Sequence, residues 1–243
     1  MLMNQVLLPI YTFLLKEYGQ QGWWPLLGPK GCKPVKTGTG YHPGDYDLPE
    51  TRNQVFEVCL GAILTQNTGW LQVETALRNL QEKGCLDPEK ILEMDIEVLK
   101  EAIRPAGYFN QKAKKVTIFT RYFLNLGQSQ IPSREELLSL WGVGPETADS
   151  MLLYAFKVPT FVIDAYTRRI FSRLGVIHEK SSYDDVKALF EQCLPKDLIL
   201  YQEYHALIVE HAKRQKKTGP EPCSLSLWLK SKKIRISIPA SKS

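Results

Sequence analysis

The chain has 243 residues, enough for one large or two small domains, each with a hydrophobic core. Hydrophobic residues make up 44% and charged residues 23%, as in ordinary globular proteins, and no apolar run reaches the roughly 20 residues of a membrane span. The net charge of +5 is uneven, because residues 212–243 hold nine Lys and Arg against one acid and carry +8, which leaves −3 elsewhere. This basic end indicates either a polyanionic partner or a solvated terminus.

The first segment, residues 1–19, is apolar but short, with neither a basic start nor a small-residue cleavage site. It predicts an amphipathic helix rather than an export signal, so we expect a cytoplasmic protein without membrane contact. A long Gly- and Pro-rich loop is expected over residues 28–44. Residues 53–66 then carry apolar side chains at i, i+3 and i+4 and predict a helix, which breaks at Thr68-Gly69.

Capping signals mark the starts of several later helices. Asp87 precedes a proline, Ser133 begins a capping box, and Ser182 is followed by an acid three residues on. Strand signals are almost absent, apart from a brief β-branched stretch at residues 160–163. The sequence therefore predicts an all-α protein of about ten helices, with a partly disordered end over residues 224–243.

Residues 140–149, LWGVGPETAD, break a helical pattern and restart it at once. Gly142 and Gly144 allow a positive φ and close approach of a ligand, and Pro145 suits the first turn of a helix. The amides of residues 142–144 would then point outward beside a helix N-terminus, an arrangement that binds phosphate. A plain turn between two helices fits the same residues.

Asp164 follows an apolar run and precedes a helical pattern over residues 165–174. Taken alone, it is an ordinary helix N-cap. It lies twenty residues after Gly144, however, and the combination of the glycine hairpin with this aspartate is more specific than either feature.

Together the two motifs resemble those of the helix-hairpin-helix DNA glycosylases of the endonuclease III superfamily. Residues 140–144 match the family's Leu-Pro-Gly-Val-Gly hairpin, with Trp141 in place of proline, and include the DNA-contacting residues Gly142, Val143 and Gly144. Residues 163–169 match its Val-Asp-x-x-x-x-Arg motif, which implies that Asp164 is catalytic.

The resemblance extends over about residues 53–216 and implies a two-domain helix-hairpin-helix DNA glycosylase fold with the active site in the cleft between the domains. One domain would be discontinuous, from residues 1–50 and 160–243. The other, of the six-helix type, would cover residues 51–159 and end in the hairpin. Double-stranded DNA is the implied partner, bound by a monomer.

Two departures from the family pattern bear on chemistry. Glu146 occupies the position where bifunctional members have a lysine, and a carboxylate cannot form a Schiff base, so water should be the nucleophile. The five cysteines are scattered, and only Cys223 lies where relatives bind a [4Fe–4S] cluster, so we expect no cluster and no required cofactor. As in relatives, the carbonyls of Leu138, Leu140 and Val143 are candidate ligands for Na⁺ or K⁺.

The phrases WWP, LTQNT and RPAGYFNQKAKK look like the bacterial 3-methyladenine DNA glycosylase III group. That likeness implies a pocket for a flipped base and a side chain that fills the gap left in the duplex. Leu207 replaces a lysine that is modified in that group, so the modification is not carried over. Core packing is the alternative for the tryptophans, and an ordinary helix-end role is the alternative for the glutamine. The implied pocket residues are Trp23, Trp24, Pro25, Trp70 and Lys213, and the implied DNA contacts are Gln66, as the wedge that fills the gap, and Asn67.

Lys112, Lys114 and Lys115 could contact the DNA backbone or form a solvated helix face. The expected reaction is hydrolysis of the N-glycosidic bond of alkylated purines, whose positive charge makes them good leaving groups and favours an aromatic pocket. A glycosylase of the same fold for a mismatched or oxidised base is one alternative. A non-catalytic binder of damaged DNA is another.

Overall fold

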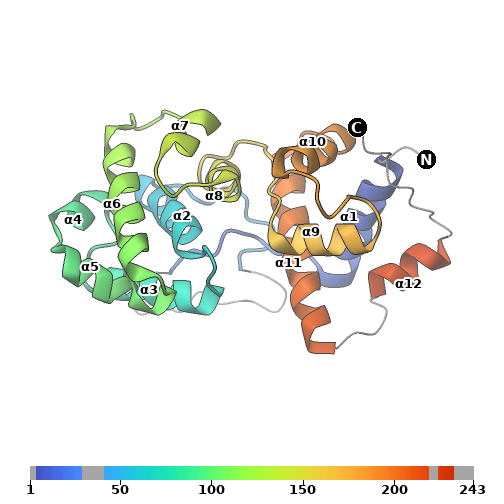
Figure 1. Cartoon of the computed structure of the whole chain (residues 1–243), viewed down its shortest axis with the longest axis horizontal. Helices are drawn as coiled ribbons and strands as arrows, with labels where there is room; N and C mark the ends of the chain where they lie inside the picture. Colours follow the sequence, from blue (N-terminus) through green and yellow to red (C-terminus); the bar gives the residue numbers. More distant parts are fainter. Residues whose placement is uncertain (1–3, 29–40, 219–223, 233–243) are drawn as a thin grey trace. The chain divides into compact units, whose positions relative to one another are not determined.

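The protein is described here by a computed structural model covering residues 4–28, 41–218 and 224–232. Within these residues the chain forms twelve α-helices, one 3₁₀ turn and one π-helical segment, without a strand, which confirms the all-α prediction (Figure 1). The helices are α1 (Asn4–Tyr18), α2 (Arg52–Leu64), α3 (Trp70–Glu82), α4 (Pro88–Glu93), α5 (Ile96–Ile103), α6 (Phe109–Asn125), α7 (Arg134–Ser139), α8 (Pro145–Ser150), α9 (Ala165–Arg173), α10 (Tyr183–Cys193), α11 (Leu198–Thr218) and α12 (Ser224–Ser231).

The chain divides into two compact units. Unit 1 comprises residues 1–23, 36–44 and 159–243, and unit 2 comprises residues 24–35 and 45–158. Both are therefore discontinuous in sequence, since the chain passes from one unit to the other after residues 23, 35, 44 and 158.

Unit 1 is built around α11, whose residues 201–212 are all buried although five of them are polar. Helix α1 packs beside it, as Figure 1 shows. Tyr204 of α11 donates to the carbonyl of Leu7 over 2.8 Å. The rings of Phe161 and Phe190 pack 4.5 Å apart between their centroids and complete an aromatic core.

The β-branched residues 160–163 form no strand, although their composition indicated one. The described part of the chain offers them no partner strand, and their polar backbone is satisfied by a side chain instead. The amide of Phe161 donates to the carboxylate of Glu191 over 2.8 Å, and Thr160 contacts the same oxygen. The segment is thus an extended, buried connection that leads directly to Asp164.

Unit 2 is built around α2, whose residues from Phe56 to Leu64 are all buried. Helix α6 covers it, and Phe56 packs against Phe123 with centroids 5.1 Å apart. The predicted helix over residues 53–66 and the capping signal at Asp87 both correspond to observed helices.

The Gly- and Pro-rich loop and the basic end were also subjects of prediction. Residues 29–40 of the expected loop and residues 233–243 of the basic end lie outside the described residues. Residues 224–231, expected to belong to a partly disordered end, form α12 instead, with Trp228 stacked on Phe13 of α1. No helix among the described residues is both long and apolar enough to span a membrane.

Helices α7 and α8 flank the Gly-Val-Gly turn and are joined by a buried ion pair. Ser133 and Glu136 form the predicted capping box at the start of α7. In the next position, Arg134 contacts both carboxylate oxygens of Asp149, at 2.9 and 3.3 Å, and the Asp149 side chain is fully buried. A buried carboxylate held in this way fixes the two helices relative to each other.

Replacing Asp149 with alanine should lower the free energy of unfolding by roughly 3 kcal/mol, because Arg134 would lose its partner in a largely buried setting. Urea denaturation measures this change. The matched control is Glu101→Ala, which removes the exposed ion pair with Arg104 and should cost less than about 1 kcal/mol. Equal losses in the two variants would show that the Arg134–Asp149 pair does not hold the hairpin.

Candidate active site and nucleic-acid interface

The glycine hairpin is a tight turn with a defined hydrogen-bond pattern. The amide of Val143 donates to the carbonyl of Leu140 over 3.0 Å, and Gly142 has φ +87°, as the third position of a type II turn requires. The Val143 amide is therefore used inside the turn and does not point outward as we expected. Within the described chain, the amides of Gly142 and Gly144 donate to no protein acceptor, so they are the two that fit the predicted phosphate site.

Lys115 and Gln66 hold this turn from the side of α6 and the end of α2. Gln66 Nε2 donates to the Gly142 carbonyl over 3.0 Å and to Thr147 Oγ1 over 2.9 Å, and Lys115 Nζ donates to Gln66 Oε1. The Lys115 stem crosses Gly142 so closely that a Cβ there would lie 2.6 Å from Lys115 Cγ. Gln66 must release these bonds to act as a wedge, and that role stays a prediction.

The exposed rim of the hairpin combines an aromatic ring with positive charge. Trp141 is 48% exposed, and Lys114 Nζ lies 4.3 Å from its ring centroid. This cation–π contact holds the lysine against the residue that precedes Gly142. Lys114 and Lys115 thus both reach the hairpin, so two charges of α6 favour an anion there.

Lys112 behaves differently from its neighbours. Its side chain is 2% exposed and donates from Nζ to the carbonyls of Leu64 and Ala106 and to Thr68 Oγ1, over 2.7–2.8 Å. Burial, aided by nearby Lys115, lowers the pKa of its amine to about 8. Both sequence interpretations of Lys112 are therefore wrong, because the residue ties the end of α2 to the following loop instead of facing DNA or solvent.

Asp164 is buried at the start of α9 and both its oxygens have neighbours. Oδ1 accepts from the Thr167 amide over 2.7 Å and from the Thr167 hydroxyl over 2.8 Å, and Oδ2 lies 3.6 Å from His205 Nε2. Burial alone would raise the pKa of Asp164, but His205 and the Thr167 bonds outweigh it and hold that pKa below its usual value. Asp164 is thus a buried anion at neutral pH.

Trp23 contacts His205, the neighbour of Asp164, within unit 1. Its ring meets the His205 imidazole edge to face at 5.7 Å, and Lys213 Nζ lies 5.7 Å from the Trp23 centroid. Trp23 is partly exposed, so one aromatic surface and one ammonium group border the same region.

The chain before Trp23 is held by Glu203, a buried polar residue of α11 to which the sequence analysis gave no role. The Glu203 carboxylate accepts from the amides of Gln21 and Gly22 over 2.7 and 2.8 Å. Gly22 has φ +55°, and a Cβ there would lie 2.2 Å from the backbone of His42. The position of Trp23 therefore depends on a glycine and on a carboxylate 180 residues away. The available signal for Glu203, and also for His205, was a polar side chain close to apolar residues of one helix.

Trp24, Pro25 and Trp70 belong to unit 2. Trp24 and Pro25 are buried, and the Trp24 ring packs edge to face on Trp70 with centroids 5.5 Å apart and planes at 87°. Gly61 makes this possible, because a Cβ there would lie 2.9 Å from Trp24 Nε1. These two rings touch, so stacking a base between them would require them to separate.

The predicted site residues are thus divided between the units. Trp23, Asp164 and Lys213 belong to unit 1, while the other pocket residues, Gln66, the exposed Asn67 and the hairpin belong to unit 2. Their meeting in one cleft stays a prediction, as do the DNA contacts and the cation ligands. In the described ranges, no group of three or more His, Cys, Asp or Glu side chains could hold a metal ion. Cys32 and Cys223 lie outside those ranges, so the expected lack of a cluster also stays a prediction.

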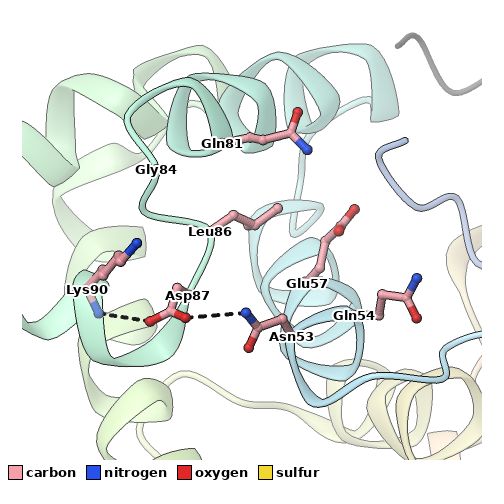
Figure 2. A pocket seen from close by; sticks show the side chains of 8 residues that line it. All are labelled: Asn53, Gln54, Glu57, Gln81, Gly84, Leu86, Asp87 and Lys90. Carbon is pink, nitrogen blue, oxygen red and sulfur yellow. Dashed lines mark hydrogen bonds between the residues drawn. The ribbon is translucent and has the colours of Figure 1, made fainter. Parts of the chain in front are cut away.

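A cavity of about 280 Å³ opens elsewhere in unit 2, and no predicted site residue lines it (Figure 2). Its walls come from α2, the end of α3 and α4, and Asp87 accepts from Asn53 and from the Lys90 amide there. Glu57, 5% exposed, faces it and accepts from the Leu27 amide. Burial raises the pKa of Glu57 to about 7, despite that hydrogen bond.

With this geometry established, comparison with known proteins identifies the class. Residues 60–196, more than half of the chain, match the HhH-GPD superfamily of base excision DNA repair proteins. The chain belongs to this family. It is therefore a helix-hairpin-helix DNA glycosylase of base excision repair, with DNA as its partner.

Individual relatives agree with this assignment. A protein of Methanocaldococcus jannaschii, named for an expected DNA repair glycosylase activity, is 45% identical over 94% of this chain and 97% of its own length. Endonuclease III of Sulfolobus acidocaldarius is 31% identical over 73% of this chain and 81% of its own.

Solved structures show the same fold. The H. pylori 3-methyladenine DNA glycosylase bound to 1,N6-ethenoadenine has a TM-score of 0.65 and 27% identity, over 88% of this chain and 98% of that one. A non-covalent endonuclease III–DNA complex has a TM-score of 0.68 at 20% identity, over 93% of this chain and 94% of that one.

The raised pKa of Glu57 makes a prediction about stability. Because the folded protein holds this proton up to about pH 7 and the unfolded chain only to about 4.5, stability should fall as pH rises between these values. Glu57→Gln should remove up to roughly 3 kcal/mol of that loss, measured by urea denaturation at pH 5 and pH 8. If wild type and variant lost the same stability over this interval, Glu57 would not be the group that titrates.

Proposed function

We propose that the protein is a monofunctional DNA glycosylase that releases alkylated purines by hydrolysing the N-glycosidic bond. The observation that supports this most is the buried anion of Asp164, whose neighbour His205 contacts the Trp23 ring. A carboxylate kept ionised in a largely dry site stabilises a developing positive charge far better than it would in water.

The proposed reaction breaks the bond between C1′ of the deoxyribose and the base nitrogen. As the bond from C1′ to the base nitrogen breaks, its electron pair leaves with the base, and positive charge grows on the deoxyribose. Asp164 stabilises that charge while the oxygen of a water molecule bonds to C1′ and releases its proton to the carboxylate or to solvent. An N3- or N7-alkylated purine starts as a cation and departs neutral, so it requires no general acid.

The alkylated class of substrate is supported by two observations. An electron-rich indole such as Trp23 attracts a cationic base by about 0.5–2 kcal/mol per contact. The H. pylori enzyme, whose name gives 3-methyladenine as its substrate, also shares 27% of its residues with this chain.

Base release without cleavage of the DNA strand is supported by Glu146, which occupies the position of the family's Schiff-base lysine. Glu146 is exposed in the first turn of α8, and a carboxylate there cannot attack the sugar as an amine does. The low-pKa amine of Lys112 is no substitute, because its three hydrogen bonds are buried.

A second candidate is a glycosylase of the same fold for an oxidised or mismatched base. The 31% identity to endonuclease III of Sulfolobus acidocaldarius favours it. The two candidates differ in the charge of the base, since a neutral lesion gains nothing from a cation-binding ring and is a poorer leaving group.

Substrate class is tested by incubating the protein with methylated duplex DNA and separating the freed bases by chromatography. We expect release of methylpurines and none of neutral oxidised or mismatched bases from matched duplexes. Release of only the neutral bases would replace the first candidate with the second. No release from any lesion, with binding retained, would indicate a non-catalytic binder.

Strand nicking tests the role of Glu146 separately. On a labelled duplex we expect breaks only after alkali, because hydrolysis leaves an intact abasic strand. Nicking without alkali would contradict this expectation, and borohydride trapping would then identify the lysine responsible.

A further inference from the structure

The two carboxylate oxygens of Asp164 have different surroundings, because one caps α9 and the other lies near α11. Thr167 occupies Oδ1 with two hydrogen bonds, which cap α9. Oδ2 is therefore the oxygen left for chemistry, and in the described structure His205 Nε2 lies 3.6 Å from it. The two side chains are 12% and 6% exposed, so little solvent screens their interaction.

His205 is itself held in place from two directions. It projects from the buried length of α11, whose neighbouring Tyr204 is anchored to α1 through the Leu7 carbonyl. The Trp23 ring meets its imidazole edge to face at 5.7 Å. One imidazole thus contacts both the carboxylate that we assign to catalysis and the ring that we assign to the base.

We propose that His205 is a positioning residue, which holds Oδ2 of Asp164 as an anion in a fixed direction beside Trp23. This inference rests on the proposed function. His205 itself transfers no proton and makes no bond to the sugar. It acts because the buried carboxylate has two hydrogen bonds at Oδ1 and an imidazole 3.6 Å from Oδ2, so both oxygens have a polar neighbour that favours the charged form. A carboxylate held only by Thr167 would lack such a neighbour at Oδ2, and burial would then disfavour its charged form more strongly.

The groups that act on the Asp164 carboxylate come from two elements, Thr167 on its own helix α9 and His205 on α11. Thr167 is neutral at all relevant pH values. Removing the imidazole should therefore let burial raise the pKa of Asp164, so that the acid limb of the rate profile moves to higher pH.

The experiment compares His205→Phe with His205→Gln in the full-length protein. Single-turnover release of methylpurine should fall roughly tenfold to a hundredfold in the phenylalanine variant, the size expected when a reacting group loses its alignment. Affinity for the methylated duplex should stay within about twofold, and the acid limb should rise by about one pH unit. The glutamine amide can still donate toward Oδ2, so it should restore part of the rate.

His211→Phe is the matched control. His211 is equally buried on α11, and its Nδ1 lies 2.8 Å from the Tyr18 hydroxyl. It should lose stability without a shift of the acid limb. If His205→Phe kept the wild-type rate and profile, or changed only as His211→Phe does, the proposal would be overturned.

A titration without substrate separates this proposal from the proposed function. Carbon-13 NMR of the Asp164 carboxyl should show a higher pKa in His205→Phe than in wild type. An unchanged pKa would overturn the positioning role even in an active enzyme. A raised pKa in a protein that releases no alkylated base would support the pairing and refute the assigned activity.

Discussion

The buried carboxylate of Asp164 is the constraint on which unit 1 and the proposed chemistry both depend. A carboxylate can be kept charged in a protein interior only if hydrogen bonds and a nearby partner offset its loss of water. Thr167 supplies two of those bonds within α9, and His205 faces the other oxygen. The same interactions that begin a helix thus also maintain an anion where positive charge would develop.

Unit 2 also contains a buried charged group that is satisfied by hydrogen bonds, in this case the ammonium group of Lys112. The ammonium group of Lys112 satisfies two backbone carbonyls and a hydroxyl at the point where α2 ends. These bonds fix the loop that begins with Gln66, and Gln66 in turn bonds the hairpin at Gly142. A buried lysine that makes no hydrogen bond with the turn itself therefore supports the geometry of the turn that would bind phosphate.

Features encoded within a few residues could be predicted from the sequence. The capping box at Ser133 and the cap at Asp164 were both correct, because capping joins side chains to amides three residues away. The interactions that could not be predicted join distant parts of the chain. Glu203 holds the chain at Gln21, and Lys112 is buried by helices that its basic neighbourhood in the sequence does not reveal. Residues 160–163 have a strand-like composition and form no strand, because a strand requires a partner that composition does not specify.

We propose that the charge of Asp164, rather than its capping bonds, drives base release. Asp164→Asn tests it most directly, because asparagine caps a helix as well as aspartate does and so keeps the fold while removing the charge. The measurement is single-turnover release of methylpurine together with the affinity for the same duplex. We expect a rate lower by roughly 10²–10³, with affinity equal or higher. A variant that released the base at the wild-type rate would contradict this account of the site.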